Sequence, residues 1–587
     1  MRRTGFHALL LATAFTATSA LAQQPAPEPE RTIPGRDRVY EPPTVQDNPG
    51  AVRVPPPEAF PTDQIPVPDR WRLADALGVG GPWWDPYGQN VLKGDLPIFG
   101  TNDWFISLTG ISDTVAELRS FPTPVGVQTT QSAGSLDVFG KADSALYTQT
   151  FIAGASIYHG STAFMPPEIE LRFAVAMNVN YAEVSERRIL SVKPTAPTHR
   201  LDGLVGLQEA FLDYHLRNVS DRYDFDSIRI GIQPFTSDFR GFLFQDNQLG
   251  IRLFGNRDSN RYQYNFAFFA RLEKDTNSGL NDITQAIRQD YVAVANLYAQ
   301  DLPLPGFISE VIAAYNMNRE SDEIHVDFNG FPARPALVGD LRPRDYDVFY
   351  LGYSGDGHIG PVNLTLTGYG AFGENRNSNF TGAPADIESW FIAAEPSLDF
   401  DWARLRLSAL YASGDDDPHD GTETGFDAIF ENPQFAGADT SYWIRQSVPF
   451  AGGGRAIFLN GRNGVLNSLR SSKEEGQSNF SNPGTILMGA GGDFDLLPEL
   501  RISANVNHIW FAETSIVEIL RQQGSVASDL GWDVSMAATW RPFLTQNIVL
   551  RASGAVLVPG DGFASLFANS TGAGQYYSVL LNAVATF

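Results

Sequence analysis

The chain contains no cysteine and no long hydrophobic run. With no Cys among 587 residues, disulfide frameworks, thiolate metal sites and cysteine nucleophiles are excluded. No stretch beyond the N-terminus approaches the roughly 20 apolar residues of a transmembrane helix. Basic residues are also scarce, at 42 Lys and Arg against 67 Asp and Glu. The resulting net charge of −25 argues against a nucleic-acid partner.

Motifs of the common hydrolases, metalloenzymes and phosphate-binding proteins are absent as well. The chain has no nucleophile elbow, no H-E-x-x-H and no phosphate-binding glycine loop. Its eight histidines are scattered, and one of them lies near the N-terminus. We therefore expect no catalytic residues and a protein that is not an enzyme.

The N-terminal residues are typical of a secretory signal. Two arginines precede a short apolar stretch, and the A-L-A at 20–22 matches an A-x-A cleavage site. We predict a signal peptide over residues 1–22 and a mature chain that begins at Gln23. Because no later segment can cross a bilayer as a helix, the exported protein would be periplasmic, secreted or an outer-membrane barrel.

Two segments separate this signal from the repetitive part of the chain. Residues 23–70 are dense in proline and in polar and charged residues, which predicts a disordered, polyproline-like linker. Residues 71–100 are aromatic, broken by glycine and not periodic. We interpret residues 71–100 as a periplasmic extension or as a plug at the mouth of a barrel.

From residue 101 onward the chain alternates between strand-like segments and connections. Eighteen segments have period-two polarity, and short and long connections alternate between them. Short periplasmic turns and longer extracellular loops are typical of bacterial barrels with an even number of strands. We therefore predict an all-β fold, a transmembrane antiparallel up-and-down barrel over residues 101–587. The predicted strands are residues 102–112, 144–158, 167–183, 205–217, 227–236, 248–255, 260–272, 289–300, 307–318, 345–354, 361–374, 387–399, 402–414, 485–496, 499–512, 527–541, 547–559 and 574–587.

The last predicted strand ends in an aromatic residue. Every second position from Tyr577 to Phe587 is apolar. A terminal aromatic residue on such a strand is the usual ending of outer-membrane barrels. We predict a location in the outer membrane of a Gram-negative bacterium. Outer-membrane lipid and the barrel assembly machinery would then be partners.

The polar phase of the strands predicts which side chains line the lumen. In the strand at 167–183, Leu171 and Phe173 would face lipid and Arg172 would face inward. The predicted lining is rich in arginine, whose forks bind carboxylates and phosphates bidentately, and contains no lysine. These arginines either attract anions or pair with acids on the wall, and errors of strand phase are a third explanation. The predicted pore-lining residues are Arg172, Glu209, Asp213, Arg229, Arg252, Arg271, Arg404, Arg406, Arg501 and Arg551.

An acidic loop follows the predicted strand at 402–414. Asp415, Asp416, Asp417 and Asp420 supply hard oxygen ligands beside glycine turns, so calcium is the one cofactor that the sequence suggests. The D-D-D-P-H-D spacing does not match the EF-hand pattern, however. A solvated acidic loop tip is the alternative interpretation.

Several segments resemble the alginate-export-type family of outer-membrane porins. The similarity lies in residues 208–244, 407–446 and 476–511, where an acidic-glycine loop is followed by FD and FAG and then by NPG before a strand. It runs from about Leu96 to the end of the chain. The resemblance implies an eighteen-stranded barrel with an arginine-lined pore for an acidic polysaccharide. The N-terminal segments lie outside the family pattern and suggest a periplasmic protein partner.

These features lead to one main functional prediction and two alternatives. The main prediction is a passive outer-membrane porin for polar or anionic solutes, or for an exported acidic polysaccharide, biased by inward arginines and gated by the 415–484 loop. The first alternative is a barrel scaffold in an outer-membrane complex with a periplasmic partner, which would conduct little by itself. The second is an adhesin or structural barrel closed by its plug.

Overall fold

The structure is a computed structural model of the 587-residue chain. It describes residues 90–98, 100–101, 103–120, 143–160, 166–220, 222, 224–334, 341–378, 380–437, 448–449, 456–457, 476–567 and 576–587. The predicted signal peptide, the proline-rich linker and most of the segment 71–100 lie outside the described residues.

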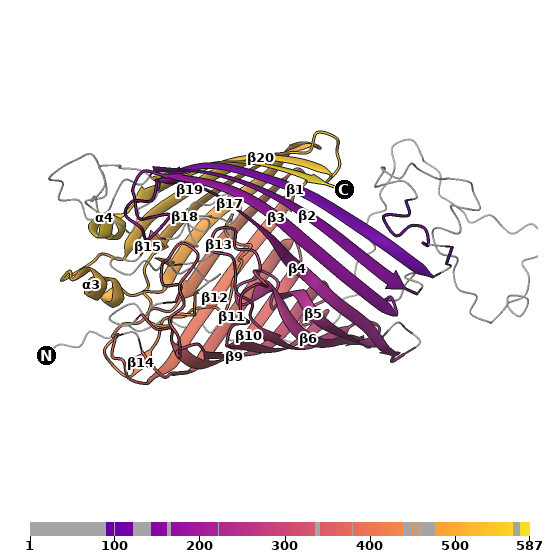
Figure 1. Ribbon diagram of the computed structural model, residues 1–587, viewed down its shortest axis with the longest axis horizontal. Helices are drawn as coiled ribbons and strands as arrows, with labels where there is room; N and C mark the ends of the chain where they lie inside the picture. The colour runs from indigo at the N-terminus through magenta and orange to yellow at the C-terminus, as the bar shows by residue number, and fades with distance from the viewer. Residues whose placement is uncertain are drawn as a thin grey trace, which may run out of the picture. The chain divides into compact units, whose positions relative to one another are not determined.

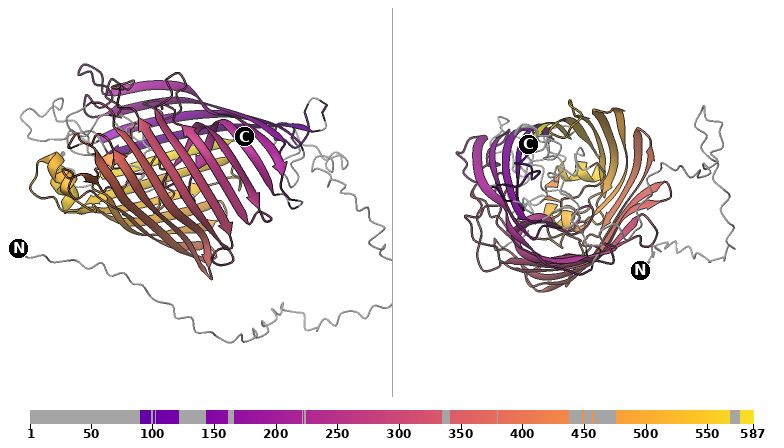
Figure 2. Two further views of the ribbon diagram at one scale, coloured as in Figure 1. Left: turned by 90° about the horizontal axis from the view of Figure 1, so that it is seen from below. Right: turned by 90° about the vertical axis from the view of Figure 1, so that its right-hand side faces the viewer.

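A closed antiparallel sheet forms the wall of a barrel (Figures 1 and 2). The sheet has 19 strands, of which β14 (Thr422–Glu423) is a two-residue addition beside β12, and the other 18 form the wall. The first strand pairs with the last from Ile111 opposite Thr586 to Arg119 opposite Ser578, so the ring closes. The wall strands are β1 (Trp104–Ser120), β2 (Asp143–His159), β3 (Ile169–Val184), β4 (His199–Asn218), β5 (Phe225–Thr236), β6 (Gln245–Arg257), β7 (Tyr262–Ala270), β8 (Asp290–Gln300), β9 (Phe307–Arg319), β10 (Asp345–Ile359), β11 (Val362–Asn375), β12 (Ala385–Phe400), β13 (Ala403–Ala412), β17 (Thr485–Leu497), β18 (Leu500–Trp510), β19 (Asp529–Trp540), β20 (Ile548–Pro559) and β21 (Tyr576–Thr586).

Each predicted strand corresponds to one of these 18 strands, which confirms the fold class and the strand count. The largest differences are extensions: β1 continues to Ser120, β4 begins at His199, and β10 continues to Ile359. These extensions are paired with neighbouring strands along their length. A paired strand does not need perfect alternation of polarity, which explains why the sequence pattern ended early.

Connections of two kinds alternate around the barrel, as predicted. At one end the strands are joined by short turns, such as the two residues between β12 and β13. At the other end the connections are longer, and they include the helices α3 (Ser515–Arg521) and α4 (Asp561–Phe567). Short turns face the periplasm in outer-membrane barrels, so we call the short-turn end periplasmic and the other extracellular.

The outer face of the wall carries the apolar phase of the strands. Along β3, every second side chain from Leu171 to Val179 is exposed, with Phe173 at 48%. Lipid is the medium that such an outward apolar belt requires, so the closed barrel confirms the predicted outer-membrane location. Among the described residues, no helix is long and apolar enough to cross a membrane.

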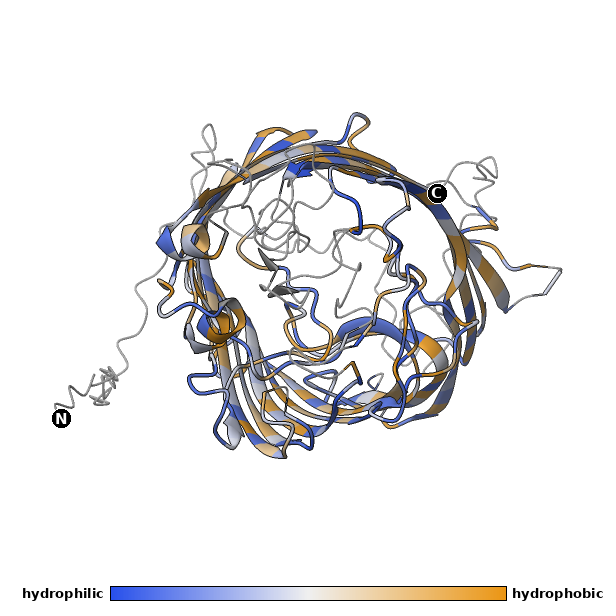
Figure 3. Cartoon of the chain, turned by 60° about the vertical axis from the view of Figure 1, so that its left-hand side comes forward, coloured by the Kyte–Doolittle hydropathy of each residue, from blue (hydrophilic) through white to orange (hydrophobic). Residues whose placement is uncertain are grey.

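Two extracellular connections fold back into the lumen, where Figure 3 shows loops crossing inside the ring. One is the β5–β6 loop, residues 237–244, and the other comprises residues 413–437 and 476–484 between β13 and β17. They are joined by backbone hydrogen bonds: the N–H of Ile429 donates to the Leu243 carbonyl at 3.1 Å, and the N–H of Gln245 donates to the Phe430 carbonyl at 2.8 Å. We call these described segments together the inward plug.

An aromatic core lies between the inward plug and the wall. Leu243, Phe244 and Ile429 of the plug are fully buried. Phe426 packs within 5.1 Å of the Phe391 ring of β12 and stacks on Tyr369 of β11. The polar phase of the strands predicted a polar lumen lining, whereas in the extracellular half the loop side chains bring apolar surface inside.

Residues 90–98 lie beside the periplasmic part of β1. Because β21 ends at Thr586, the edge of β1 nearer its start has no partner from that strand. The N–H of Leu108 instead donates to the Leu92 carbonyl at 2.7 Å, and the ammonium of Lys93 lies 4.1 Å from the centre of the Phe587 ring. This segment covers a strand edge that would otherwise be open to pairing with another chain.

Candidate functional site in the lumen

The predicted arginines of the wall strands lie on its inner face. On β13, for example, Leu405 and Leu407 are 48% and 62% exposed on the lipid side, and Arg406 between them points the other way. Its guanidinium NH2 donates to the amide oxygen of Asn505 on β18 at 2.5 Å, so the side chain extends over the inner face of β17. The structure thus places Arg406 on the face of β13 opposite to the two leucines.

Most of these arginines pair with an acid on a neighbouring strand. Arg229 donates two hydrogen bonds to the Oδ2 of Asp213, at 2.9 and 2.7 Å. The remaining pairs of this kind are Arg172 with Glu209, Arg404 with Asp399, Arg406 with Asp493 and Arg501 with Asp495. Of the explanations that the sequence left open, wall ion pairing accounts for these five arginines.

Arg252 differs from the paired arginines. Its Nε donates to the Asn265 amide oxygen at 2.7 Å, and its guanidinium lies 4.7 Å from the Phe254 ring centre and 5.5 Å from that of Phe235. Within the described part of the chain, no carboxylate comes within the 4.0 Å of an ion pair with it. The negative faces of two aromatic rings supply part of the compensation that an acid would give.

Arg271 does not line a pore, contrary to the prediction. The strand β7 ends at Ala270, so Arg271 begins the β7–β8 loop, where it is 1% exposed. Its NH1 donates to the Oδ2 of Asp290 at 2.7 Å. The prediction failed because the apolar alternation of the sequence continues to residue 272, while the chain leaves the wall two residues earlier.

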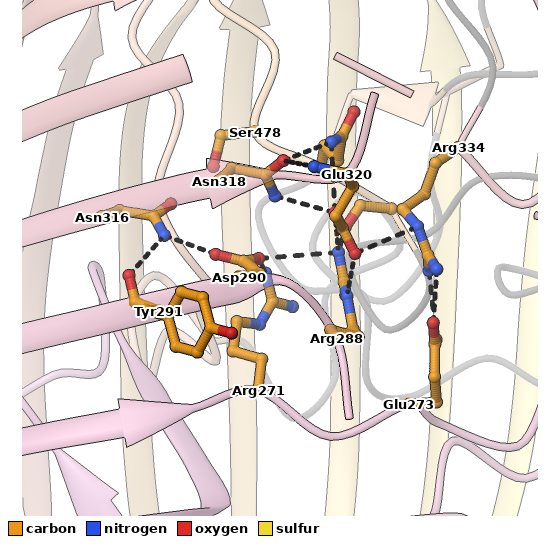
Figure 4. A network of polar contacts seen from close by, with 12 residues as sticks. Arg271, Glu273, Arg288, Asp290, Tyr291, Asn316, Asn318, Glu320, Arg334 and Ser478 are labelled. Atoms are coloured by element: carbon orange, nitrogen blue, oxygen red, sulfur yellow. Dashed lines mark hydrogen bonds and ion pairs between the residues drawn. The ribbon is translucent and has the colours of Figure 1, made fainter. Parts of the chain in front are cut away.

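The Arg271–Asp290 pair belongs to a buried network at the extracellular side of β8 and β9 (Figure 4). The guanidinium of Arg288 contacts both carboxylate oxygens of Glu320 at 2.9 Å, and its NH2 lies 3.5 Å from Asp290. Arg334 pairs with Glu273 and lies 3.4 Å from Glu320. Burial opposes the charged form of Glu320, but Arg288 and Arg334 outweigh it and hold the pKa of this carboxyl far below its usual range.

This network also holds the inward plug. The NH2 of Arg288 donates to the Gly476 carbonyl at 3.1 Å, and the amide of Gln477 donates to Asn318 at 2.8 Å and to Glu320 at 3.1 Å. The backbone N–H of Arg344 in turn donates to the Gln477 side chain at 2.7 Å. Residues 476–479 are thereby fixed to the loops that join β7 to β10.

A cavity of about 270 Å³ lies in the periplasmic half of the lumen. The plug segment from Gln434 to Gly437 lines one side of it, and residues near the periplasmic ends of β13 and β17–β20 line the rest. Five arginines face this cavity against two carboxylates, and these side chains are Arg240, Arg406, Arg501, Arg541, Arg551, Glu395 and Asp493. The lining of the cavity is therefore positively charged.

Two of the cavity arginines were not found from the sequence. Arg240 comes from the β5–β6 loop, and its guanidinium NH2 donates to Thr365 at 2.6 Å while NH1 donates to the Gln434 carbonyl at 3.1 Å. Arg541 follows β19 in a periplasmic turn. Neither segment has a period of two, so no phase assigned them to the lumen. The buried Lys274 was not found from the sequence for the same reason. Its ammonium contacts Asp246 at 2.8 Å.

The four predicted calcium ligands differ in their surroundings. Asp415 is fully buried, whereas Asp416, Asp417 and Asp420 are exposed. Among the described residues, no three His, Asp or Glu side chains gather closely enough to hold a metal ion by themselves. The structure does not bring the four carboxylates together as one ligand set.

Comparisons with known proteins identify similar barrels. No protein-family model matches the chain, and no curated protein matches its sequence. Solved Pseudomonas aeruginosa structures are similar in architecture: OccK5 (OpdH) at a TM-score of 0.42 and 10% identity, OccK9 (OpdG) at 0.43 and 11%, and OpdK with vanillate at 0.41 and 10%, each covering 82% of this chain and 98% of the other. The resemblance to the alginate-export-type family is not supported by these matches. With identities and TM-scores this low, function has to be argued from this chain's own residues.

Proposed function

We propose that the protein is an outer-membrane channel for small polar or anionic solutes. The observation that supports it most is the cavity inside the barrel, where five arginines face two carboxylates. A closed barrel of 18 strands is wide enough to hold a water-filled passage. The cavity lies at the end of the lumen that the aromatic core leaves free, so a solute from the periplasmic side would meet these arginines first.

Arg406 and Arg501 pair with Asp493 and Asp495, and Arg240 lies 3.5 Å from Glu395, so three carboxylates offset the five guanidinium groups. The excess of two positive charges gives the cavity its selectivity in this proposal. Guanidinium groups stay charged at any cellular pH and match the geometry of carboxylates and phosphates. A confined space with low-dielectric walls focuses their field and raises the local concentration of anions. Wall pairs such as Arg229 with Asp213 hold the strands in register and add little net charge.

The size of the cavity favours small solutes over a polymer. At about 270 Å³ it lies just below the range of about 300–1,000 Å³ that is typical of pockets for drug-sized ligands. The acidic polysaccharide that the alginate-export resemblance implies would need a continuous passage. It could pass only after the inward plug had left the lumen, so we place small anions first and the polysaccharide second.

Ion selectivity in planar bilayers tests the proposal. We expect the purified protein to form channels with a reversal potential that indicates anion preference. Arg541→Glu should move that potential toward cation selectivity, because Arg541 faces the cavity, donates to Gln546 at 3.2 Å and has no ion pair within 4.0 Å among the described residues. Arg541→Glu changes the charge by two units, and each unit at roughly 4 Å in water is worth about 1 kcal/mol, so the relative permeability should change by up to about thirtyfold.

A matched control separates the cavity from the general charge of the barrel. Arg222 lies in an exposed periplasmic turn, so Arg222→Glu makes the same charge change outside the cavity. We expect this variant to keep the wild-type selectivity. If both variants shift the reversal potential equally, or if neither shifts it, the arginine cavity does not select ions and the proposal is wrong.

One feature favours the alternative of a barrel scaffold with a periplasmic partner. The inward plug crosses the extracellular half of the lumen and packs an aromatic core against the wall, an arrangement that would reduce conductance. For a scaffold, bilayers would show almost no conductance, and affinity purification from membranes would recover a stoichiometric periplasmic protein. A conducting protein that purifies alone would exclude it.

A further inference from the structure

A buried carboxylate without a counter-charge lies where the inward plug leaves the wall. Asp415 follows β13 by three residues and is 0% exposed. Neither of its oxygens accepts a hydrogen bond of normal geometry from the described residues, and no basic group there lies within ion-pair distance. The backbone N–H of Asp417 gives the charged form some stabilisation. Burying an unpaired carboxylate costs on the order of several kcal/mol.

The groups around Asp415 are also acidic. Glu423, Asp420 and Asp416 are the charged groups that act on it most strongly. Glu423 is only 2% exposed, because β14 pairs it with Ile387 of β12, and the Asn375 amide donates to both of its oxygens at 3.0 and 3.2 Å. Two buried carboxylates and two exposed ones therefore share this corner of the barrel.

The cation that acts on Glu423 is already committed to other partners. The guanidinium of Arg344 donates to the Asn479 amide oxygen at 3.0 Å and also to the Ser478 carbonyl. Burial, together with the negative charges of Glu423 and Asp420, raises the pKa of Asp415 to about 7. A buried carboxylate whose two oxygens have no hydrogen-bond partner among the described residues is suited to bind a cation.

We propose that Asp415 and Glu423 bind a calcium ion, whose remaining ligands are backbone carbonyls and water. Calcium takes six to eight oxygen ligands, of which carboxylates need be only a part. Because no three acidic side chains of the described residues converge here, the site belongs with the weaker extracellular calcium sites, with a dissociation constant of about 10⁻⁴–10⁻³ M. This assignment differs from the one that the sequence suggested, since Glu423 replaces the exposed Asp416, Asp417 and Asp420.

The position of the site gives the ion a structural task. The N–H of Asp415 donates to the Asn482 carbonyl at 2.8 Å, and the N–H of Gly425 donates to the Phe480 carbonyl at 2.8 Å. The outgoing and returning limbs of the inward plug thus meet beside the two carboxylates. A bound calcium ion would hold both limbs against β12 and keep the plug in the lumen.

Hydrogen exchange of the purified barrel tests the proposal. Peptides that cover residues 413–425 are compared in 10 mM CaCl₂, in 10 mM MgCl₂ and in NaCl of equal ionic strength. With the dissociation constant above, calcium should slow exchange of these amides roughly 10- to 100-fold. Asp415→Asn should remove the calcium effect while the variant still folds, because the amide keeps the volume of the carboxylate and carries no buried charge.

The matched control is Asp416→Asn, which removes the same charge from the neighbouring exposed residue. It should keep the calcium effect. An equal loss in both variants would show that calcium only screens a negative loop, and an equal effect of magnesium and calcium would mean the same. If calcium changes nothing in the wild type, Asp415 is protonated instead, and the proposal is overturned.

Discussion

Removal of Arg288 should release the inward plug from the wall. The side chain of Arg288 is fully buried and contacts Glu320 twice at 2.9 Å, Asp290 at 3.5 Å and the Gly476 carbonyl at 3.1 Å. Arg288→Met keeps most of the volume but leaves both acids with less positive charge. Breaking a buried pair by removing one partner costs about 3–5 kcal/mol. Glu320 retains Arg334 at 3.4 Å, so we expect the lower value, about 3 kcal/mol.

Hydrogen exchange measures this change where it occurs. Peptides covering residues 476–484 should exchange faster by about two orders of magnitude, since about 1.4 kcal/mol corresponds to a factor of ten. Peptides from β17 and β18 should keep wild-type rates, because the barrel wall remains closed. If a channel is present, its single-channel conductance should also rise as the plug leaves the lumen.

Two further variants decide whether the buried charges cause the effect. Arg288→Met combined with Glu320→Gln removes the unpaired acid and should restore a large part of the protection. Arg319→Met deletes a half-exposed arginine that pairs with Asp345 and Asp347, and it should cost less than about 1 kcal/mol. Wild-type exchange of residues 476–484 in Arg288→Met would refute the role assigned to the network.

Three other predictions concern single residues. The pKa of Asp415 lies above that of an unfolded aspartate, so without calcium the protection of residues 413–425 should rise as the pH falls from 8 through about 7, and Asp415→Asn should abolish this dependence. Asp238 accepts backbone N–H bonds from Arg240, Phe242 and Leu243 at 2.9–3.1 Å, so Asp238→Ala should loosen the β5–β6 loop by about 2–4 kcal/mol, seen as faster exchange of residues 237–244, while an unchanged rate would contradict its anchoring role. Deletion of Phe587, which exchanges two backbone hydrogen bonds with Gly110, should reduce membrane insertion without blocking export, and normal levels of heat-modifiable barrel in outer-membrane fractions would count against this.

The sequence by itself determined the barrel wall. Lipid on one side and a lumen on the other impose a period of two on every wall strand, and this period predicted all 18 strands and their outward face. The alternating loop lengths predicted the connections between them. The strand ends were less well predicted, as at Ala270, because the polarity pattern continues past the point at which the chain leaves the wall.

Only the tertiary structure decided what the lumen contains. Arg406 and Asp493 are 87 residues apart and Arg288 and Gly476 are 188 apart, so the partner of an inward side chain cannot be found from its own strand. The loops that fold inward have no polarity pattern that assigns a direction. The aromatic core and the cavity arginines Arg240 and Arg541 therefore became visible only after the fold had placed those segments. Strand phase is set locally by two solvents, whereas the filling of the barrel is set by contacts between distant segments.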